Sequence, residues 1–237
     1  MSVLSRLASA QGVRSDAPNQ ALARDLARTQ DREGIREVVA GLTSRDRRVQ
    51  SECIKVLYEI GYIDPELIAE YAAEFFRLLG SRNNRLVWGG MIALSTIARL
   101  RPQEVFDGMA GILEEMAQGS VITVDAGVAA LAAAAATGAE RRAAILPCLL
   151  EHLSSCRPNS VAQHAEKMLE AVDAAHCERF VAILQARLPE LTASQQTRVR
   201  RVIGKAGKQG VWEEGRACRK AGRASLLRGT MPRLQLN

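Results

Sequence analysis

Apolar positions along the chain recur at helical spacing and with a longer period of 37 residues. The segment from Ser44 to Ile60 aligns without a gap on the segment from Ser81 to Ile97. Between the segments of this set lies a second set of apolar pairs, each pair four residues apart: Val38 and Leu42, Phe75 and Leu79, Ile112 and Met116, Leu149 and Leu153, and Leu184 and Leu188. Residues with this spacing share one helix face. Two helix sets with a common period predict an all-α solenoid of about five stacked helical hairpins.

Helix-terminating and capping residues fall where this arrangement needs them. Asp64 and Pro65 are typical of an N-cap followed by proline at the first helical position. The four-residue segments 160–163 and 192–195 each have the pattern of a capping box, in which a Ser or Thr hydroxyl and a Gln side chain bond to each other's backbone. Gly80, Gly119 and the Arg-Pro pairs at 101–102 and 157–158 mark the breaks between helices.

The recurring apolar set resembles that of HEAT repeats, whose second helix typically has the pattern V-x-x-x-A-x-x-A-L-x-x-I. Two stretches carry the pattern most clearly: Val49, Cys53, Val56, Leu57 and Ile60, and then Leu86, Gly90, Ala93, Leu94 and Ile97. The segment 145–153, with Pro147, is similar to the first helix of that family. The resemblance covers residues 31–206. It implies an α-α superhelix and fits scaffolds, adaptors and a few enzymes alike, so it does not decide function.

The resemblance also divides the chain into three parts. Residues 1–30 are expected to hold an N-terminal segment and a capping helix, in which Leu22 and Leu26 lie one turn apart. Residues 31–206 form the repeat domain. Residues 207–237 are expected to be a disordered basic tail, because they lack a sustained apolar period.

Charge is distributed unevenly between these parts. The chain has a formal net charge of +6 and a pI near 9.4. Residues 204–237 carry eight Lys or Arg residues against two Glu residues, which accounts for the whole excess. The repeat body is therefore neutral overall, and the argument from basic pI toward nucleic acid applies only to the tail.

The five cysteines are odd in number and contain no C-x-x-C pair, which indicates a reduced, cytoplasmic protein. The Ala-rich run at 126–139 is too short to span a bilayer, so no membrane association is expected.

A helical wheel predicts what the second helices present on their concave side. If Val49, Cys53 and Val56 belong to the buried stripe, the opposite ridge carries residues 48, 51, 55 and 58, and equivalent positions follow in later repeats. The ridge then contains Arg48, Ser51, Lys55, Tyr58, Arg85, Trp88, Ile92, Ser95, Ile122, Asp125, Ala129, Ala132, Ser160, Gln163, Lys167 and Glu170. Its candidate binding residues are Arg48, Arg85, Trp88, Ile92, Asp125, Gln163 and Lys167. Trp88 stands out, because an exposed tryptophan is typical of a binding hot spot, although it could instead pack on a neighbouring helix.

Catalytic and metal chemistry have little support in the residues. Cys148, His152 and Cys156 recur every fourth residue, and His164 follows, but no compact pair closes a zinc site, so a structural role is expected and no metal or cofactor is assigned. Gly89 and Gly90 lie inside a helical pattern, where they permit close packing rather than phosphate binding. There is no nucleophile-elbow, P-loop or dinucleotide motif.

The sequence therefore predicts a non-enzymatic scaffold or adaptor that binds a partner protein or peptide on its concave face. The alternative is a nucleic-acid-binding protein, through the basic tail, or a HEAT-like DNA glycosylase that uses Trp88 and Asp125.

Overall fold

The computed structural model describes residues 2–208, and these contain helices and no strand. The α-helices are α1 (Ala17–Thr29), α2 (Arg32–Gly41), α3 (Arg47–Ile63), α4 (Ala72–Leu79), α5 (Asn84–Ile97), α6 (Pro102–Asp107), α7 (Met109–Gln118), α8 (Val121–Ala135), α9 (Ala139–Ser155), α10 (Pro158–Met168) and α11 (Ala174–Arg187). Residues 193–208 are also helical. Short 3₁₀ turns cover Val3–Arg6, Pro65–Leu67, Ala69–Tyr71, Leu169–Ala171 and Leu188–Glu190. No helix in this part of the chain has the length and apolarity needed to cross a bilayer.

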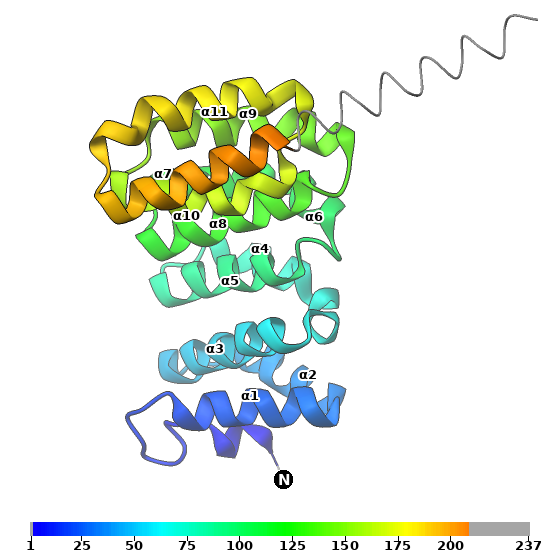
Figure 1. Cartoon of the computed structure of the whole chain (residues 1–237). Helices are drawn as coiled ribbons and strands as arrows, with labels where there is room; N and C mark the ends of the chain where they lie inside the picture. The colour runs from blue at the N-terminus through cyan, green and yellow to red at the C-terminus, as the bar shows by residue number, and fades with distance from the viewer. Residues whose placement is uncertain (1, 209–237) are drawn as a thin grey trace, which may run out of the picture. The chain divides into compact units, whose positions relative to one another are not determined.

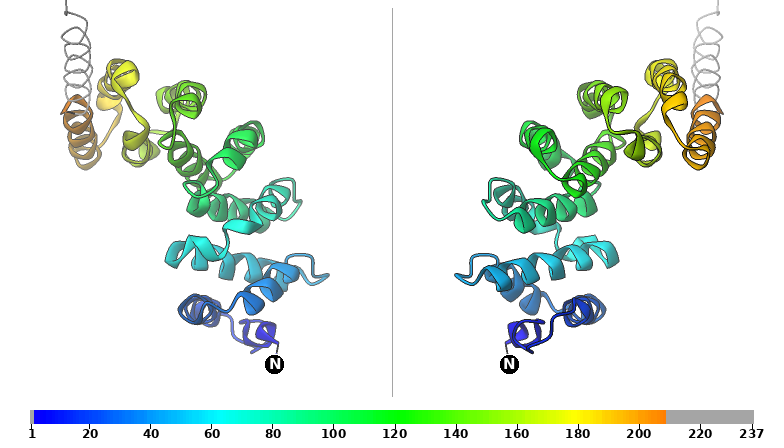
Figure 2. Two further views of the ribbon diagram at one scale, coloured as in Figure 1. Left: turned by 90° about the vertical axis from the view of Figure 1, so that its right-hand side faces the viewer. Right: turned by 90° about the vertical axis from the view of Figure 1, so that its left-hand side faces the viewer.

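The described residues form two compact units, which divide after residue 151. In the first unit, α1, α3, α5 and α8 pack in sequence, each against the next. The helices α2, α4 and α7 pair with α3, α5 and α8, so that three hairpins follow one another through the unit (Figures 1 and 2). The capping helix expected within residues 1–30, with Leu22 and Leu26, corresponds to α1, which packs on α3.

The N-caps of the packed helices repeat with the same period as the apolar residues. Asp46, Asn83 and Ser120 precede α3, α5 and α8 at intervals of 37 residues. Each side-chain oxygen accepts a hydrogen bond from a backbone N–H in the first turn, at 2.7 Å for Asp46 and 3.1 Å for Asn83. These bonds satisfy donors that a helix leaves open at its start. The caps therefore set the register in which one hairpin follows the next.

The core consists of the apolar positions that the repeat predicts. Val56, Leu57 and Ile60 of α3 are fully buried, and so are Ala93, Leu94 and Ile97 one period later. The paired helices contribute residues such as Val38, Phe75 and Ile112, which are also fully buried. Burial of this apolar surface is the main favourable contribution to the stability of the stack.

In the second unit, Pro158 is the first residue of α10. The predicted capping box at 160–163 is therefore wrong: Ser160 lies inside α10, buried, and Arg157 occupies the N-cap position. Proline at the first position had already fixed the start of the helix two residues earlier. The predicted box at 192–195 is confirmed, because the Thr192 N–H donates to Gln195 Oε1 at 2.9 Å and the Gln195 N–H donates to Thr192 Oγ1 at 3.4 Å.

Candidate binding surface on helices α3 and α5

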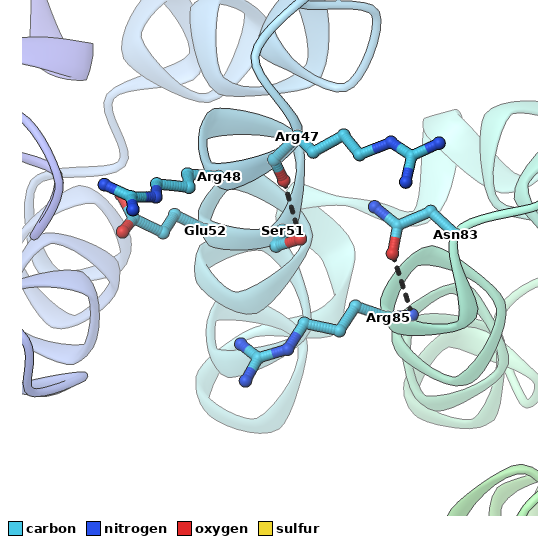
Figure 3. Close-up of a pocket in the computed structure, with 6 residues that line it drawn as sticks. All are labelled: Arg47, Arg48, Ser51, Glu52, Asn83 and Arg85. Atoms are coloured by element: carbon cyan, nitrogen blue, oxygen red, sulfur yellow. Dashed lines mark hydrogen bonds between the residues drawn. The ribbon is translucent and has the colours of Figure 1, made fainter.

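Three arginines gather at the N-terminal ends of α3 and α5. Arg47 and Arg48 belong to the first turn of α3, and Arg85 belongs to the first turn of α5. With Ser51, Glu52 and Asn83 they line an open surface pocket of about 280 Å³. In Figure 3, Arg47 extends toward Asn83, whereas Arg85 extends back toward α3 below Ser51. The pocket therefore presents guanidinium groups from two successive repeats.

The electrostatics of this pocket favour an anion. Neither α3 nor α5 has an acidic residue in its first turn, so the arginines add positive charge to the positive end of each helix dipole. The carboxylate of Glu52 accepts hydrogen bonds from the Ser9 N–H at 3.0 Å and from the Ser9 hydroxyl at 2.7 Å. Among the described residues, no ion pair involves the three guanidinium groups. Such groups can bind a carboxylate through two parallel hydrogen bonds, and they cannot act as acids or bases near neutral pH.

An aromatic group continues the same surface along both helices. Trp88 follows Arg85 by one turn, and its ring centroid lies 6.0 Å from that of Tyr58. Tyr58 also contacts Tyr62 edge to face, at 6.1 Å. The Lys55 ammonium lies 4.9 Å from the Tyr58 ring centroid and 2.6 Å from Glu59 Oε1. Tyr62 is 63% exposed, so an accessible aromatic edge remains beside the buried Tyr58.

Burial affects the ionisation of this group without making it catalytic. Desolvation raises the pKa of the Tyr58 and Tyr62 phenols, so both stay protonated. For Lys55, burial alone would lower the pKa, but the hydrogen bond to Glu59 and the contact with Tyr58 outweigh it, and the net pKa is raised. These side chains therefore offer apolar and hydrogen-bonding surface, together with an ammonium group that is paired with Glu59.

Close approach of α3 and α5 brings the rings together. A Cβ atom on Gly89 would lie 2.7 Å from Ile54 Cγ1, and one on Gly90 would lie 3.0 Å from the Phe75 carbonyl oxygen. Gly89 needs glycine, because real Cβ atoms do not come so near to such a neighbour, and at Gly90 a Cβ atom would require Phe75 to shift by a few tenths of an ångström. The expectation that the Gly89-Gly90 pair permits close packing agrees with this geometry.

The structure brings some of the predicted site residues together and separates others. Arg48 and Arg85 are exposed and share the pocket, and Trp88 and Ile92 continue along α5, both half-buried. Asp125 lies half-buried on α8, the next helix of the stack. Gln163 and Lys167 lie in α10 of the second unit, half-buried. The site assignment of these residues stays a prediction.

The wheel was wrong at three ridge positions. Tyr58, Ala132 and Ser160 are buried, with exposed fractions of 6%, 2% and 7%. A wheel treats each helix as isolated, whereas here Trp88 and Tyr62 contact Tyr58 from two sides. Trp88 correspondingly packs on the neighbouring helix while keeping part of its ring accessible.

Arg47, Glu52 and Asn83 were missed as members of the pocket. The signal was present in the sequence, because Ser-Arg-Asp-Arg-Arg at 44–48 and Ser-Arg-Asn-Asn-Arg at 81–85 occupy the same place in two repeats. Each segment places an N-cap and a basic residue at the start of a second helix. A helical wheel identifies only the positions opposite the buried stripe, so it does not reveal that the N-terminal ends of these second helices carry similar residues in both repeats.

Comparison with known proteins supports the fold class. No family model matches the chain, and no curated protein matches it. Among solved structures, it is similar to an engineered protein with a TM-score of 0.63 and 20% identity, over 87% of this chain and 96% of the other. It is also similar to a designed armadillo repeat protein in complex with the peptide (KR)4, with a TM-score of 0.63 and 14% identity, over 88% and 98% of the two chains. A third structure, of computationally designed armadillo repeat proteins for modular peptide recognition, gives 0.62 and 12%, over 86% and 98%. The chain therefore has an all-α helical-repeat fold; at this identity the likeness concerns fold alone.

Proposed function

We propose that this protein is a non-enzymatic, HEAT-like scaffold that binds a partner protein through a short acidic segment followed by an apolar residue. The observation that carries the proposal is the pocket that Arg47, Arg48 and Arg85 line, none of which forms an ion pair among the described residues. An acidic side chain of the partner would supply the missing counter-charge.

The charges of the pocket argue for a carboxylate-bearing ligand. Three guanidinium groups exceed the Glu52 carboxylate in the pocket and the Asp46 carboxylate that caps α3, so a net positive charge remains at these two helix N-termini. Hydrogen bonds from guanidinium to carboxylate are shorter and stronger than neutral ones. Because the arginines are exposed, they are hydrated in the free protein. Salt should therefore weaken the electrostatic attraction between these arginines and an acidic ligand.

The aromatic group argues for an apolar residue next to the acidic one. Positions 48 and 58 of α3 are ten residues apart, which corresponds to about 15 Å along a helix. An extended peptide covers that distance with about five residues. A segment with acidic residues over the arginine pocket could therefore place an apolar side chain against the accessible parts of Trp88 and Tyr62, where burial of apolar area adds affinity.

The fold comparison supports a peptide as the ligand class. The helical-repeat architecture has been seen with a bound peptide in a designed armadillo repeat protein, whose ligand was the basic peptide (KR)4. The pocket on α3 and α5 has the opposite charge preference. Charge complementarity therefore selects an acidic ligand on a surface of this kind.

The proposal can be tested by fluorescence anisotropy with labelled peptides. Peptides in which two Glu precede Leu or Phe should bind, whereas (KR)4 and peptides with Gln in place of Glu should not. Binding should weaken as salt rises. The double variant Arg48→Glu, Arg85→Glu should lose binding, and Arg24→Glu, an exposed arginine of α1 outside the pocket, should retain it.

Two results would overturn the proposal. One is equal binding of the acidic and Gln-substituted peptides, which would mean that charge does not select the ligand. The other is tighter binding of a single-stranded oligonucleotide than of any acidic peptide, with the same loss on reversal of Arg48 and Arg85. That outcome would favour the nucleic-acid alternative, because phosphates would then be the preferred anions.

A further inference from the structure

Two histidines and a cysteine converge in the second unit. His152 lies in the last turn of α9, Cys156 follows one turn later, just beyond the end of that helix, and His164 belongs to α10. His152 Nε2 and His164 Nδ1 are 3.1 Å apart. The candidate ligand atoms of all three residues lie within 4.8 Å of one another. Within residues 2–208 no other trio of this kind is found.

These separations are close to those of a coordinated zinc-class ion. Zinc binds imidazole nitrogen at about 2.0–2.1 Å and thiolate sulfur at about 2.3 Å with tetrahedral geometry. Two nitrogens bound to one such ion lie about 3.3 Å apart, and a nitrogen and a sulfur lie about 3.6 Å apart. The two histidine nitrogens are close to this requirement, and the sulfur–nitrogen distances, at most 4.8 Å, would shorten by up to about 1.2 Å.

The backbone around the cluster is fixed independently of any ion. Arg187 of α11 donates from Nη1 to the Leu153 carbonyl oxygen at 2.8 Å and from Nη2 to the Cys156 carbonyl oxygen at 2.5 Å. Glu190 pairs with Arg187 at 3.0 Å and offsets its charge. Pro158 then starts α10, which carries His164 back toward α9. The turn between α9 and α10, which contains Cys156, is therefore held in place by hydrogen bonds from Arg187.

Burial distinguishes this group from a chance surface cluster. His164 is fully buried, and His152 and Cys156 are half-buried. A buried imidazole needs a polar partner, and the two imidazoles are partners of each other through His152 Nε2 and His164 Nδ1. Two imidazoles and a thiol are the ligand types that zinc and related borderline cations prefer over magnesium or calcium.

We propose that His152, Cys156 and His164 bind one divalent cation of the zinc class and that this ion ties the last turn of α9 to α10. As the cation binds, the thiol releases its proton to solvent, and the imidazole that donates the histidine hydrogen bond moves that proton to its other ring nitrogen, so that both facing nitrogens can bind the ion. Three protein ligands leave a fourth position for water or an external ligand. The sequence predicts no metal site, because no compact pair of ligands completes the cluster along the chain. In the structure, His164 of the next helix, α10, adds the missing ligand.

Cobalt is a suitable probe, because Co²⁺ takes zinc sites and a cobalt–thiolate bond gives a near-ultraviolet charge-transfer band. Tag-free full-length protein, reduced and freed of metal, should develop this band with one Co²⁺ per chain, and Zn²⁺ should abolish it. Cys156→Ser should lose the band, and His152→Gln should bind Co²⁺ at least about tenfold more weakly. Cys148→Ser and Cys177→Ser are matched controls, since both change half-buried thiols outside the cluster, and both should keep the band.

Stability provides a second readout. Zn²⁺ should raise the melting temperature of the wild type and of the two control variants but not that of Cys156→Ser, because a ligand stabilises only the state that binds it. Far-UV circular dichroism checks that Cys156→Ser is folded; if it is not, His152→Gln gives the same comparison. The proposal is overturned if no thiolate band appears with the wild type, or if the band survives in Cys156→Ser, which would place the thiolate elsewhere, for example at Cys218 outside the described residues.

Discussion

The Trp88 ring packs against the Tyr58 ring of the preceding repeat, with centroids 6.0 Å apart and an interplanar angle of 51°. This contact joins α5 to α3 on the same surface as the arginine pocket. Trp88 therefore contributes to stability and to the proposed binding surface at once. A substitution at this position is expected to affect both properties, and the two effects need separate measurements.

Trp88→Ala should lower the free energy of unfolding by about 2 kcal/mol, less than for a fully buried tryptophan, because the ring is half-buried. Trp88→Phe keeps an aromatic contact and should cost about half as much. Urea unfolding followed by circular dichroism measures both. A loss below about 0.5 kcal/mol for Trp88→Ala would show that the ring contact with Tyr58 contributes little.

Arg85→Glu should separate binding from folding. A glutamate at the start of α5 interacts favourably with the helix dipole, so the free energy of unfolding should rise by about 0.5 kcal/mol. Affinity for the acidic peptide should fall by at least about tenfold, because a charge-assisted hydrogen bond is replaced by repulsion. Anisotropy and urea unfolding test the two effects. Arg85→Gln is the intermediate control, and equal affinity for wild type and Arg85→Glu would exclude this arginine from the site.

Gly89→Ala should destabilise the protein by about 1–3 kcal/mol, although alanine is the better helix former. The added Cβ would meet Ile54 Cγ1 at 2.7 Å and Cγ2 at 3.0 Å. Gly111→Ala in α7 is the matched control, because its Cβ would meet nothing within 4 Å, and it should stabilise by up to about 1 kcal/mol.

The double variant Gly89→Ala, Ile54→Ala tests the cause. Ile54→Ala alone should cost about 2–5 kcal/mol, but it removes the atoms that the new methyl group would strike. Gly89→Ala should then be neutral or stabilising in that background, which appears as a favourable coupling energy in the cycle. Simple additivity would mean that the close contact is not what destabilises Gly89→Ala.

The repeat period was sufficient to predict the helices, since the positions it marks are the buried ones. Val56 and Ala93 are one period apart and both fully buried, and the caps Asp46 and Asn83 follow the same interval. Regularities of this kind can be predicted from the sequence, because the buried face and the caps of a helix are determined by residues three or four positions apart.

The sites were harder to predict because they depend on which helices meet. Tyr58 occupies a ridge position on an isolated helix but is covered by Trp88 from 30 residues away. His164 was noticed near Cys156, yet only the turn before α10 brings it within 3.1 Å of His152. Helix periodicity contains no information about such distances between elements. Equivalent positions in successive repeats, such as Arg48 and Arg85, are the one signal in the sequence that indicates which residues of different helices lie on the same surface.

Arg187→Met should destabilise the second unit by about 2–3 kcal/mol. The side chain is only 8% exposed and donates to the carbonyl oxygens of Leu153 and Cys156, and methionine would leave both acceptors without this donor. Amide hydrogen exchange over residues 150–190 should increase. Arg179→Met, an exposed arginine on the same helix, should leave exchange unchanged. Unchanged exchange in Arg187→Met as well would show that these hydrogen bonds do not hold the end of α9.

Cys53 should make the stability of the protein depend on alkaline pH. Burial raises the pKa of its thiol to about 12, whereas an exposed thiol ionises near pH 8.5. The stabilisation is present in full below the unfolded-state pKa and is lost as pH rises toward the folded-state pKa, because only the unfolded chain then releases the proton. The free energy of unfolding should fall by up to about 1.4 kcal/mol per pH unit above pH 9. Cys53→Ala should show a shallower decline in urea unfolding between pH 9 and 10, with a residual slope because burial also raises the pKa of the Cys156 thiol and of the Tyr58 phenol. Cys148→Ala should keep the wild-type slope, and an unchanged slope in Cys53→Ala would assign the dependence to other groups.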